Sequence, residues 1–166
     1  MIPQPVLRFL LRGLFRLLYR VEVHGAEHLR TPADRMLIVV NHVSLLDAPL
    51  LLAFLDRPAV YAINTRVARW WWLRPAHRLA ELLTLDPTNP LAVKTLLAKV
   101  KEGRPCVIFP EGRISVTGAL MKIYAGPAWI ADRAEALVLP VRIEGAERSP
   151  FSYLTRGQVR RRWFPK

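Results

Sequence analysis

Short apolar runs that alternate with helical segments restrict this chain to one class of fold. Residues 36–40 and 105–109 are apolar throughout and have the length of strands buried in a core. Helical patterns lie between them, at residues 45–55 and 90–101. Because 166 residues suffice for one hydrophobic core and not for two independent ones, we expect a single domain. The predicted fold is α/β, with a central mixed sheet and helices packed on it.

Weaker patterns predict the remaining elements. A further helix is expected at residues 124–134, and further strands at residues 19–24, 59–63, 82–85 and 137–143. Pro140 lies inside the last of these strands. Because proline has no N–H to donate to a ladder, that strand is expected at an edge of the sheet or with a bulge.

The first twenty residues predict a helix with an unusual charge pattern. Arginine recurs at every fourth position and leucine occupies the opposite arc of the helical wheel. These residues are Arg8, Arg12, Arg16 and Arg20, and Leu7, Leu10, Leu11, Leu14, Leu17 and Leu18. A surface helix that packs its leucines on the core is one interpretation. Because the polar arc lacks acidic residues, we favour a membrane-surface helix over residues 1–20, with Arg8, Arg12 and Arg16 at lipid headgroups.

Three consecutive tryptophans, Trp70, Trp71 and Trp72, lie among arginines in residues 66–78. Neighbours on a helix point about 100 degrees apart, so the three side chains cannot all face one core. Tryptophan beside arginine suits the headgroup layer of a membrane, and core packing with aromatic–arginine contacts is the alternative. We favour a second membrane contact at these tryptophans.

The charge of the chain predicts an anionic partner. Lys and Arg number 25 against 13 Asp and Glu, a net charge of +12 that would attract nucleic acid, anionic lipid or an acidic protein. No apolar run is long enough to span a bilayer, so a peripheral position on the membrane surface is expected. Cys106 is the one cysteine and lies in an apolar run, which excludes an intrachain disulfide and suits a cytoplasmic location. The histidines and this cysteine show no metal-ligand spacing, so we expect no metal.

A histidine and an aspartate occur where the first buried strand ends and a helix begins. Sites of α/β proteins lie at such junctions. From the start of the helix, Asp47 can turn back to one imidazole nitrogen of His42 and leave the other nitrogen free to accept a proton. This pair predicts a dyad that activates a hydroxyl, although a lone histidine is more often structural. Ser44 between them lacks a glycine-rich elbow and is interpreted as a packing or capping residue.

A second polar motif follows the other buried strand. Glu111, Gly112 and Arg113 lie where that strand opens into a loop. A carboxylate, a glycine and a guanidinium in this position could orient a polyol and grip a phosphate. A turn with a surface ion pair is the alternative. The presence of the His42–Asp47 motif favours a binding site.

The order of these motifs resembles the glycerolipid acyltransferase superfamily, whose members acylate glycerol 3-phosphate or lysophospholipids. The matching motifs are Asn41-His42 to Asp47, then Phe109-Pro110-Glu111-Gly112, then Leu139-Pro140-Val141. The resemblance implies an acyltransferase domain over residues 21–166 that needs no cofactor. It also implies that His42 is the general base, that Asp47 supports it, and that Asn41, Glu111 and Gly112 bind the acceptor.

More narrowly, two stretches resemble the acyltransferase domain of the bacterial bifunctional 2-acylglycerophosphoethanolamine acyltransferase/acyl-[acyl-carrier-protein] synthetase. They are Leu85-Asp86-Pro87-Thr88-Asn89-Pro90 and Met121-Lys122-Ile123-Tyr124. This resemblance implies an acyl-carrier protein or acyl-CoA donor, a covalent C-terminal synthetase domain, and the cytoplasmic face of the inner membrane as the location.

The chain departs from the superfamily pattern in its phosphate-binding residues. An arginine usual in that block is absent at Leu85 and Asp86, and the usual Glu-Gly-Thr-Arg-Ser reads Glu-Gly-Arg-Ile-Ser at residues 111–115. The resemblance therefore implies a phosphodiester acceptor, lysophosphatidylethanolamine, in phospholipid repair or remodelling, with Arg113 and Lys122 at its phosphate. A lysophosphatidate acyltransferase of de novo synthesis is the alternative.

Three other functions compete with acyl transfer. A single-stranded nucleic-acid module would suit the charge and the Trp/Arg cluster, but the basic residues accompany leucines in membrane-type patterns and no known binding motif occurs, so no nucleic-acid partner is expected. A non-catalytic membrane or acyl-chain-binding module would not need His42, Asp47 and Glu111. A lipid hydrolase would use the same dyad with water, and would release fatty acid without an acceptor.

Overall fold

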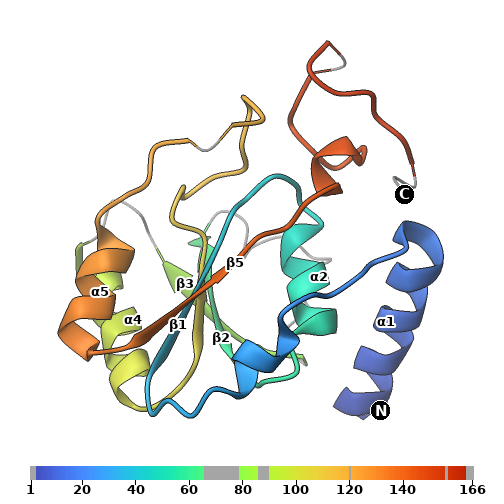
Figure 1. The fold of residues 1–166 in the computed structure, drawn as a ribbon. Helices are drawn as coiled ribbons and strands as arrows, with labels where there is room; N and C mark the ends of the chain where they lie inside the picture. The colour runs from blue at the N-terminus through green and yellow to red at the C-terminus, as the bar shows by residue number, and fades with distance from the viewer. Residues whose placement is uncertain (1–2, 66–78, 86–89, 120, 156, 164–166) are drawn as a thin grey trace.

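The computed structural model describes residues 3–65, 79–85, 90–119, 121–155 and 157–163. A five-stranded sheet lies at the centre and helices cover both of its faces (Figure 1). The strands are β1 (Met36–Val40), β2 (Val60–Asn64), β3 (Glu81–Leu85), β4 (Cys106–Ile108) and β5 (Leu137–Val141). The helices are α1 (Gln4–Tyr19), α2 (Asp47–Phe54), α4 (Pro90–Lys101) and α5 (Gly126–Ala134), with 3-10 turns η1 (Ala26–Arg30) and η3 (Ala146–Arg148).

The sheet is parallel throughout its described strands, in the order β3-β2-β4-β1-β5, where a mixed sheet was expected. The physical reason lies in the connections. Helix α2 separates β1 from β2, α4 separates β3 from β4, and α5 separates β4 from β5. Such helical crossovers return the chain in the same direction, whereas a hairpin would reverse it. All five strands therefore end at the same edge of the sheet.

Strand β1 is buried on both faces, as its apolar sequence predicts. Ile38 packs on one side in a cluster with α2, and Leu37 packs on the other side in a cluster with α4 and α5. Both residues are 0% exposed. A central strand covered by helices on both faces has no polar face, which is why its sequence does not alternate. This strand gives a rigid base to the residues that follow it.

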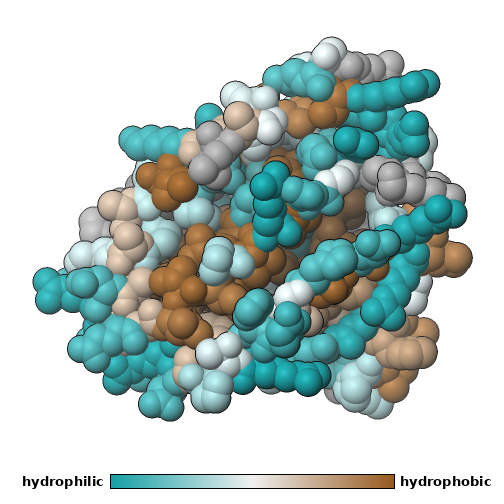
Figure 2. Space-filling model, in the orientation of Figure 1, coloured by the Kyte–Doolittle hydropathy of each residue, from teal (hydrophilic) through white to brown (hydrophobic). Residues whose placement is uncertain are grey.

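Strand β5 lies at an edge of the sheet, which confirms the position expected from Pro140. Leu137 and Val138 of this strand are 40% and 45% exposed. Figure 2 shows hydrophobic side chains gathered at the centre of this view, over the region of β5.

The strand expected at residues 19–24 is wrong. Helix α1 continues to Tyr19, and residues 20–25 lie outside any helix or strand. The alternating sequence suits a pleated surface, but such a pattern forms a strand only beside a partner. Val23 is instead 46% exposed.

Helix α1 lies beside α2 (Figure 1). Its arginine arc faces the protein. Arg8 donates to the carbonyl oxygen of Leu55 at 3.1 Å, and Arg12 donates to that of Ala53. These carbonyls belong to the last turn and the C-cap of α2, where the helix has no N–H groups left to bind them. The two guanidinium groups therefore cap α2 and hold α1 on the domain.

The headgroup contacts expected of Arg8, Arg12 and Arg16 are not what the structure shows. Arg16 lies over the ring of Phe54, 5.7 Å from its centroid, so all three cations face α2. Unbound carbonyls offer guanidinium groups hydrogen bonds that leucine side chains cannot make, which explains this orientation. Five large apolar side chains of α1 are exposed, beside the exposed Gln4 and Arg16: Val6, Phe9, Leu10, Leu14 and Leu17. Figure 2 shows hydrophobic side chains at the right-hand edge, where α1 lies.

Candidate active site

The candidate site lies where the chain leaves β1 and β4, two neighbouring strands. From β1 the chain passes to α2 on one face of the sheet, and from β4 it passes to α5 on the other face. A crevice forms at the carboxyl ends of strands where such connections diverge. His42 follows the end of β1, and Glu111 follows the end of β4. The parallel sheet thus brings together two motifs that are far apart in the sequence.

His42 and Asp47 form the dyad that the sequence predicts. The Nδ1 atom of His42 lies 2.8 Å from Oδ2 of Asp47. The same Oδ2 accepts the backbone N–H groups of Val43 at 2.7 Å and Ser44 at 2.9 Å. Because a carboxylate oxygen only accepts, the neutral imidazole of His42 carries its proton on Nδ1 and keeps the lone pair on Nε2. Asp47 is fully buried, so this carboxylate is fixed by donors rather than by water.

The remaining contacts of His42 orient its free nitrogen. Its ring stacks on Phe109, with centroids 4.2 Å apart. Its backbone N–H donates to Oε1 of Glu111 at 3.0 Å, and its carbonyl accepts the N–H of Ser115 at 2.7 Å. The imidazole side chain is 18% exposed, and in the described part of the chain Nε2 has no hydrogen-bond partner. This nitrogen can accept a proton from a ligand hydroxyl.

Glu111 holds the backbone and does not point at a ligand, contrary to the expected acceptor contact. Oε1 accepts the N–H of His42, and Oε2 accepts the N–H of Met121 at 3.2 Å. The residue is only 3% exposed. A buried carboxylate between two distant amides lowers its desolvation cost by binding both of them. Glu111 therefore ties the end of β1 to the loop of residues 112–124.

This arrangement predicts the effect of Glu111→Gln on stability. The glutamine keeps the size of the side chain but places an NH2 group against the N–H of either His42 or Met121. We expect the free energy of unfolding in urea to fall by about 1–3 kcal/mol, because a buried donor loses its acceptor. Glu135→Gln is the matched control, since its side chain is 88% exposed, and it should unfold like the native protein. Equal unfolding of all three proteins would show that the carboxylate is not required.

Asn41 also has a structural role in place of the expected acceptor contact. Its Nδ2 donates to the carbonyl oxygen of Ile143 at 2.9 Å, and its Oδ1 accepts the N–H of Ile143 at 2.7 Å. This pair of bonds ties the end of β1 to the chain just beyond β5. The side-chain amide is thereby used by the protein and is not offered to a ligand.

Gly112, Arg113 and Lys122 lie on the exposed loop after β4. Gly112 has φ +67°, and an added Cβ would lie 3.4 Å from the Tyr124 ring, so the turn requires glycine here. Arg113 reaches the sulfur of Met121, and Nζ of Lys122 lies 5.4 Å from the Tyr124 ring centroid. Neither cation has an ion pair among the described residues. Their assignment to the phosphate of an acceptor stays a prediction.

The tryptophans Trp70, Trp71 and Trp72 lie outside the described residues. Sequence reasoning missed Phe109 as a support for His42, although an aromatic residue at the end of a strand next to the motif was a usable signal. It also missed the backbone acceptors and donors around the dyad, for which the sequence carries no signal. Among the residues that the structure describes, no cluster of three His, Cys, Asp or Glu side chains could hold a metal ion. Burial raises the pKa of Cys106 to about 12, so its thiol stays protonated.

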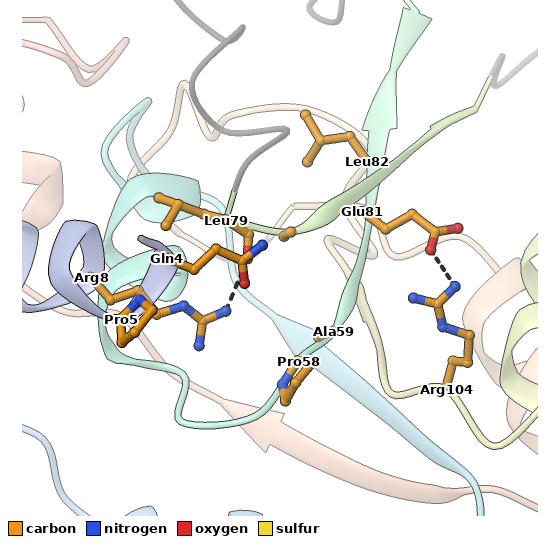
Figure 3. A pocket seen from close by; sticks show the side chains of 10 residues that line it. Gln4, Pro5, Arg8, Pro58, Ala59, Leu79, Glu81, Leu82 and Arg104 are labelled. Carbon is orange, nitrogen blue, oxygen red and sulfur yellow. Dashed lines mark hydrogen bonds and ion pairs between the residues drawn. The ribbon is translucent and has the colours of Figure 1, made fainter. Parts of the chain in front are cut away.

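A pocket of about 650 Å³ lies away from the dyad (Figure 3). It is lined by residues at the starts of β2 and β3, among them Ala59, Glu81 and Leu82. Because the sheet is parallel, the starts of its strands lie at the edge opposite His42. Figure 3 shows that Arg8 binds the Leu79 backbone and that Glu81 pairs with a neighbouring cation there. The charged side chains of Arg8 and Glu81 already have partners within the protein. Since the pocket lies at the opposite edge of the sheet from His42, it is not part of the candidate site.

Sequence comparisons find similarity to known acyltransferases. A family model described as Acyltransferase matches residues 20–144. The 1-acyl-sn-glycerol-3-phosphate acyltransferase BAT2 of Brassica napus chloroplasts is 26% identical over 134 residues, which cover 76% of this chain and 38% of that protein. The 1-acyl-sn-glycerol-3-phosphate acyltransferase of Cocos nucifera is 26% identical over 130 residues, covering 75% and 41%. This chain therefore spans about two fifths of the length of these curated relatives.

A solved structure is similar over most of the chain. The crystal structure of the 1-acyl-sn-glycerophosphate (LPA) acyltransferase PlsC from Thermotoga maritima has a TM-score of 0.68 and 26% sequence identity. The similar region covers 87% of this chain and 59% of that one. The single α/β domain with its parallel sheet and packed helices is shared by both.

Proposed function

This chain belongs to the acyltransferase family, and on that premise we propose that it transfers a fatty acyl group from an acyl thioester to the free hydroxyl of a lysophospholipid. The observation that carries the proposal is the dyad: Nδ1 of His42 is held by Asp47, and Nε2 is left without a partner among the described residues. A histidine in this state can remove a proton from a hydroxyl. The acceptor then needs no nucleophile from the protein.

In the proposed reaction, one imidazole both accepts and returns the proton. Nε2 of His42 takes the proton of the acceptor hydroxyl as the oxygen attacks the thioester carbonyl. The tetrahedral intermediate collapses, the carbon–sulfur bond breaks, and the imidazolium returns its proton to the departing thiolate. Asp47 stabilises the imidazolium between these steps through the 2.8 Å contact with Nδ1.

The proposed acceptor is lysophosphatidylethanolamine, in phospholipid repair or remodelling. Support comes from the loop after β4, where Arg113 and Lys122 are exposed cations without an ion pair in the described part of the chain. A phosphodiester carries one negative charge and suits such a loosely held pair of cations. The alternative acceptor is lysophosphatidate, which the names of the curated relatives support. These acceptors differ in the charge and substitution of the phosphate, so a direct comparison can separate them.

The proposed donor is an acyl-carrier protein or acyl-CoA, and the proposed context is a larger protein. The net charge of +12 suits an acidic carrier or a nucleotide-bearing donor. The narrower sequence resemblance supports a C-terminal synthetase domain that would supply acyl-carrier-protein thioesters.

We place α1 at the membrane surface by its apolar side chains. The exposed fractions are 75% for Phe9, 53% for Leu10 and 77% for Leu17, on the side away from α2. Water-exposed apolar residues along one side of a helix can enter the acyl boundary of a leaflet. In the described part of the chain, no helix is long and apolar enough to cross a membrane. The proposal is a peripheral enzyme at the cytoplasmic face of the inner membrane, with residues 1–20 as the interfacial helix and 21–166 as the catalytic domain.

The apolar side of α1 predicts the effect of charge on membrane binding. Leu10→Glu with Leu17→Glu should lower binding to anionic liposomes at least about tenfold in a sedimentation assay, because inserted leucines each contribute about 1.5–3 kcal/mol. Leu91→Glu is the matched control, since Leu91 is 61% exposed on α4, and it should bind like the native protein. If the double variant binds liposomes as well as the native protein, α1 does not enter the bilayer.

The test of the proposed function is a direct transfer assay. The purified protein is incubated with a labelled acyl-CoA or acyl-carrier protein and with lysophosphatidylethanolamine or lysophosphatidate in detergent. A higher kcat/KM for lysophosphatidylethanolamine than for lysophosphatidate supports the proposal. A higher kcat/KM for lysophosphatidate supports the alternative acceptor. Free fatty acid released without an acceptor would indicate a hydrolase. No product with either acceptor and donor would contradict acyl transfer by this chain.

A further inference from the structure

A segment far from the dyad in the sequence contacts the loop between His42 and Asp47. Residues 145–155 follow the stretch that the family model matches, and the chain leaves β5 to pass over the start of α2 (Figure 1). There Oγ of Ser149 lies 3.0 Å from Oγ of Ser44. Both serines are 0% exposed. A hydroxyl contact between buried residues this far apart in sequence holds two segments together without help from water.

The proton order in this contact follows from its partners. Oγ of Ser149 lies 2.7 Å from the carbonyl oxygen of Ala146, which can only accept. The proton of Ser149 is therefore used there, and the proton of Ser44 must point to Ser149. Oγ of Ser44 in turn accepts the N–H of Leu46 at 3.2 Å. Ser149 thus fixes the direction of the Ser44 hydroxyl, and no second arrangement satisfies every atom.

The backbone N–H groups of residues 42–47 show which other segments hold this loop. Four N–H groups bind acceptors within the loop, and they belong to Val43, Ser44, Leu46 and Asp47. The other two bind elsewhere. His42 donates to Glu111, and Leu45 donates to the carbonyl oxygen of Phe151 at 3.1 Å. The loop is anchored at its start by Glu111 and at its middle by residues 149–151.

We propose that Ser149 is a positioning residue for the dyad, acting through Ser44. The N–H of Ser44 is one of the donors on Oδ2 of Asp47, and the same oxygen holds Nδ1 of His42. By fixing Ser44, Ser149 keeps Oδ2 aimed at the imidazole. The kinetic consequence rests on the proposed acyl transfer, whereas the geometric consequence for the imidazole does not.

The test compares Ser149→Ala with Ser152→Ala in the full chain. Ser152 is a matched control because it is 3% exposed in the same segment. Among the described residues its hydroxyl has a local partner, the N–H of Leu154, whose hydrogen bond it accepts. With ¹⁵N-labelled histidine, the Nδ1–H resonance of His42 is assigned by its loss in His42→Ala. We expect this resonance to weaken or shift in Ser149→Ala and to stay in place in Ser152→Ala. We also expect kcat for acyl transfer to fall about tenfold in Ser149→Ala at little change in KM, since small displacements of a catalytic group are costly.

Two results separate this inference from the proposed function. A native Nδ1–H resonance in Ser149→Ala, together with native kcat where the wild type transfers acyl groups, would overturn the positioning role. A wild type without any transferase activity would remove the proposed function, yet the resonance would still decide the role of Ser149. If Ser149→Ala does not fold, Ser149→Cys replaces it, because the thiol keeps a weaker donor at the same position. The unfolding temperature of each variant is measured as well. A variant that unfolds below the assay temperature loses kcat because it is unfolded, and it says nothing about positioning.

Discussion

His42→Ala should lower kcat for acyl transfer at least about a thousandfold, the range of a general base that no other group replaces. Nε2 of His42 has no partner among the described residues, and its ring is held by Phe109 and Asp47. Removing the imidazole leaves water as the base for the acceptor hydroxyl. The measurement is formation of diacyl product from a labelled acyl thioester, with KM for the acceptor determined in parallel.

The matched control for this variant is His24→Ala. The side chain of His24 is 87% exposed, and its Nε2 lies 3.6 Å from a carboxylate oxygen of Glu22. It should leave kcat, KM and the unfolding midpoint unchanged, because a solvated pair of this kind contributes little to stability. Diacyl product from His42→Ala at a rate near that of the native protein would exclude His42 as the base and would move the search for the catalytic group elsewhere.

Asp47→Asn should lower kcat about a hundredfold or more while keeping the fold. The asparagine oxygen can take the place of Oδ2 and accept the same donors from His42, Val43 and Ser44. Its NH2 group then occupies the place of Oδ1, a buried atom without a partner in the described structure. The geometry is largely kept, but the negative charge that stabilises the imidazolium is lost. The expected signature is a fall in kcat at nearly constant KM.

Asp47→Ala separates the charge from the hydrogen bonds. This variant also removes the acceptor of the Val43 and Ser44 N–H groups, each of which would be left buried or partly buried without a partner. We expect a further loss of about 1–3 kcal/mol per orphaned donor in the free energy of unfolding, measured in urea. If Asp47→Asn retains the native kcat, the charge of Asp47 is not used in catalysis. If Asp47→Ala is as stable as Asp47→Asn, the carboxylate does not organise the loop.

Local sequence patterns predicted most of the secondary structure. Strand β1 and helix α4 occupy the residues expected of them. The signal for the strand is an uninterrupted apolar run, and the signal for the helix is an amphipathic pattern with proline at its start. Both signals lie within the element itself. The strand expected at residues 19–24 failed for the opposite reason. A strand exists only with a neighbour, and the alternating pattern did not indicate whether a neighbour was present. The same limit explains why a mixed sheet was expected, since strand direction depends on the crossovers.

The sequence motifs identified the polar residues around the dyad but predicted a ligand as their partner, where the structure shows backbone groups. Asn41 and Glu111 lie beside the site as expected, but their side chains bind backbone groups of Ile143, His42 and Met121. A motif shows which residues gather at a site. It does not show whether a carboxylate or amide faces the ligand or the surrounding backbone, because both offer hydrogen-bond partners to the same atoms.

The sequence by itself determined the α/β class, most of the elements and the His42–Asp47 pair. These depend on residues within a turn or two of one another, and the two residues of the dyad are five positions apart. Only the tertiary structure decided the roles of Glu111, of Arg8 and of Ser149. Their partners lie 69, 47 and 105 residues away along the chain, at His42, Leu55 and Ser44. Buried donors and acceptors must find partners wherever the fold brings them, and no local pattern records which distant group that will be.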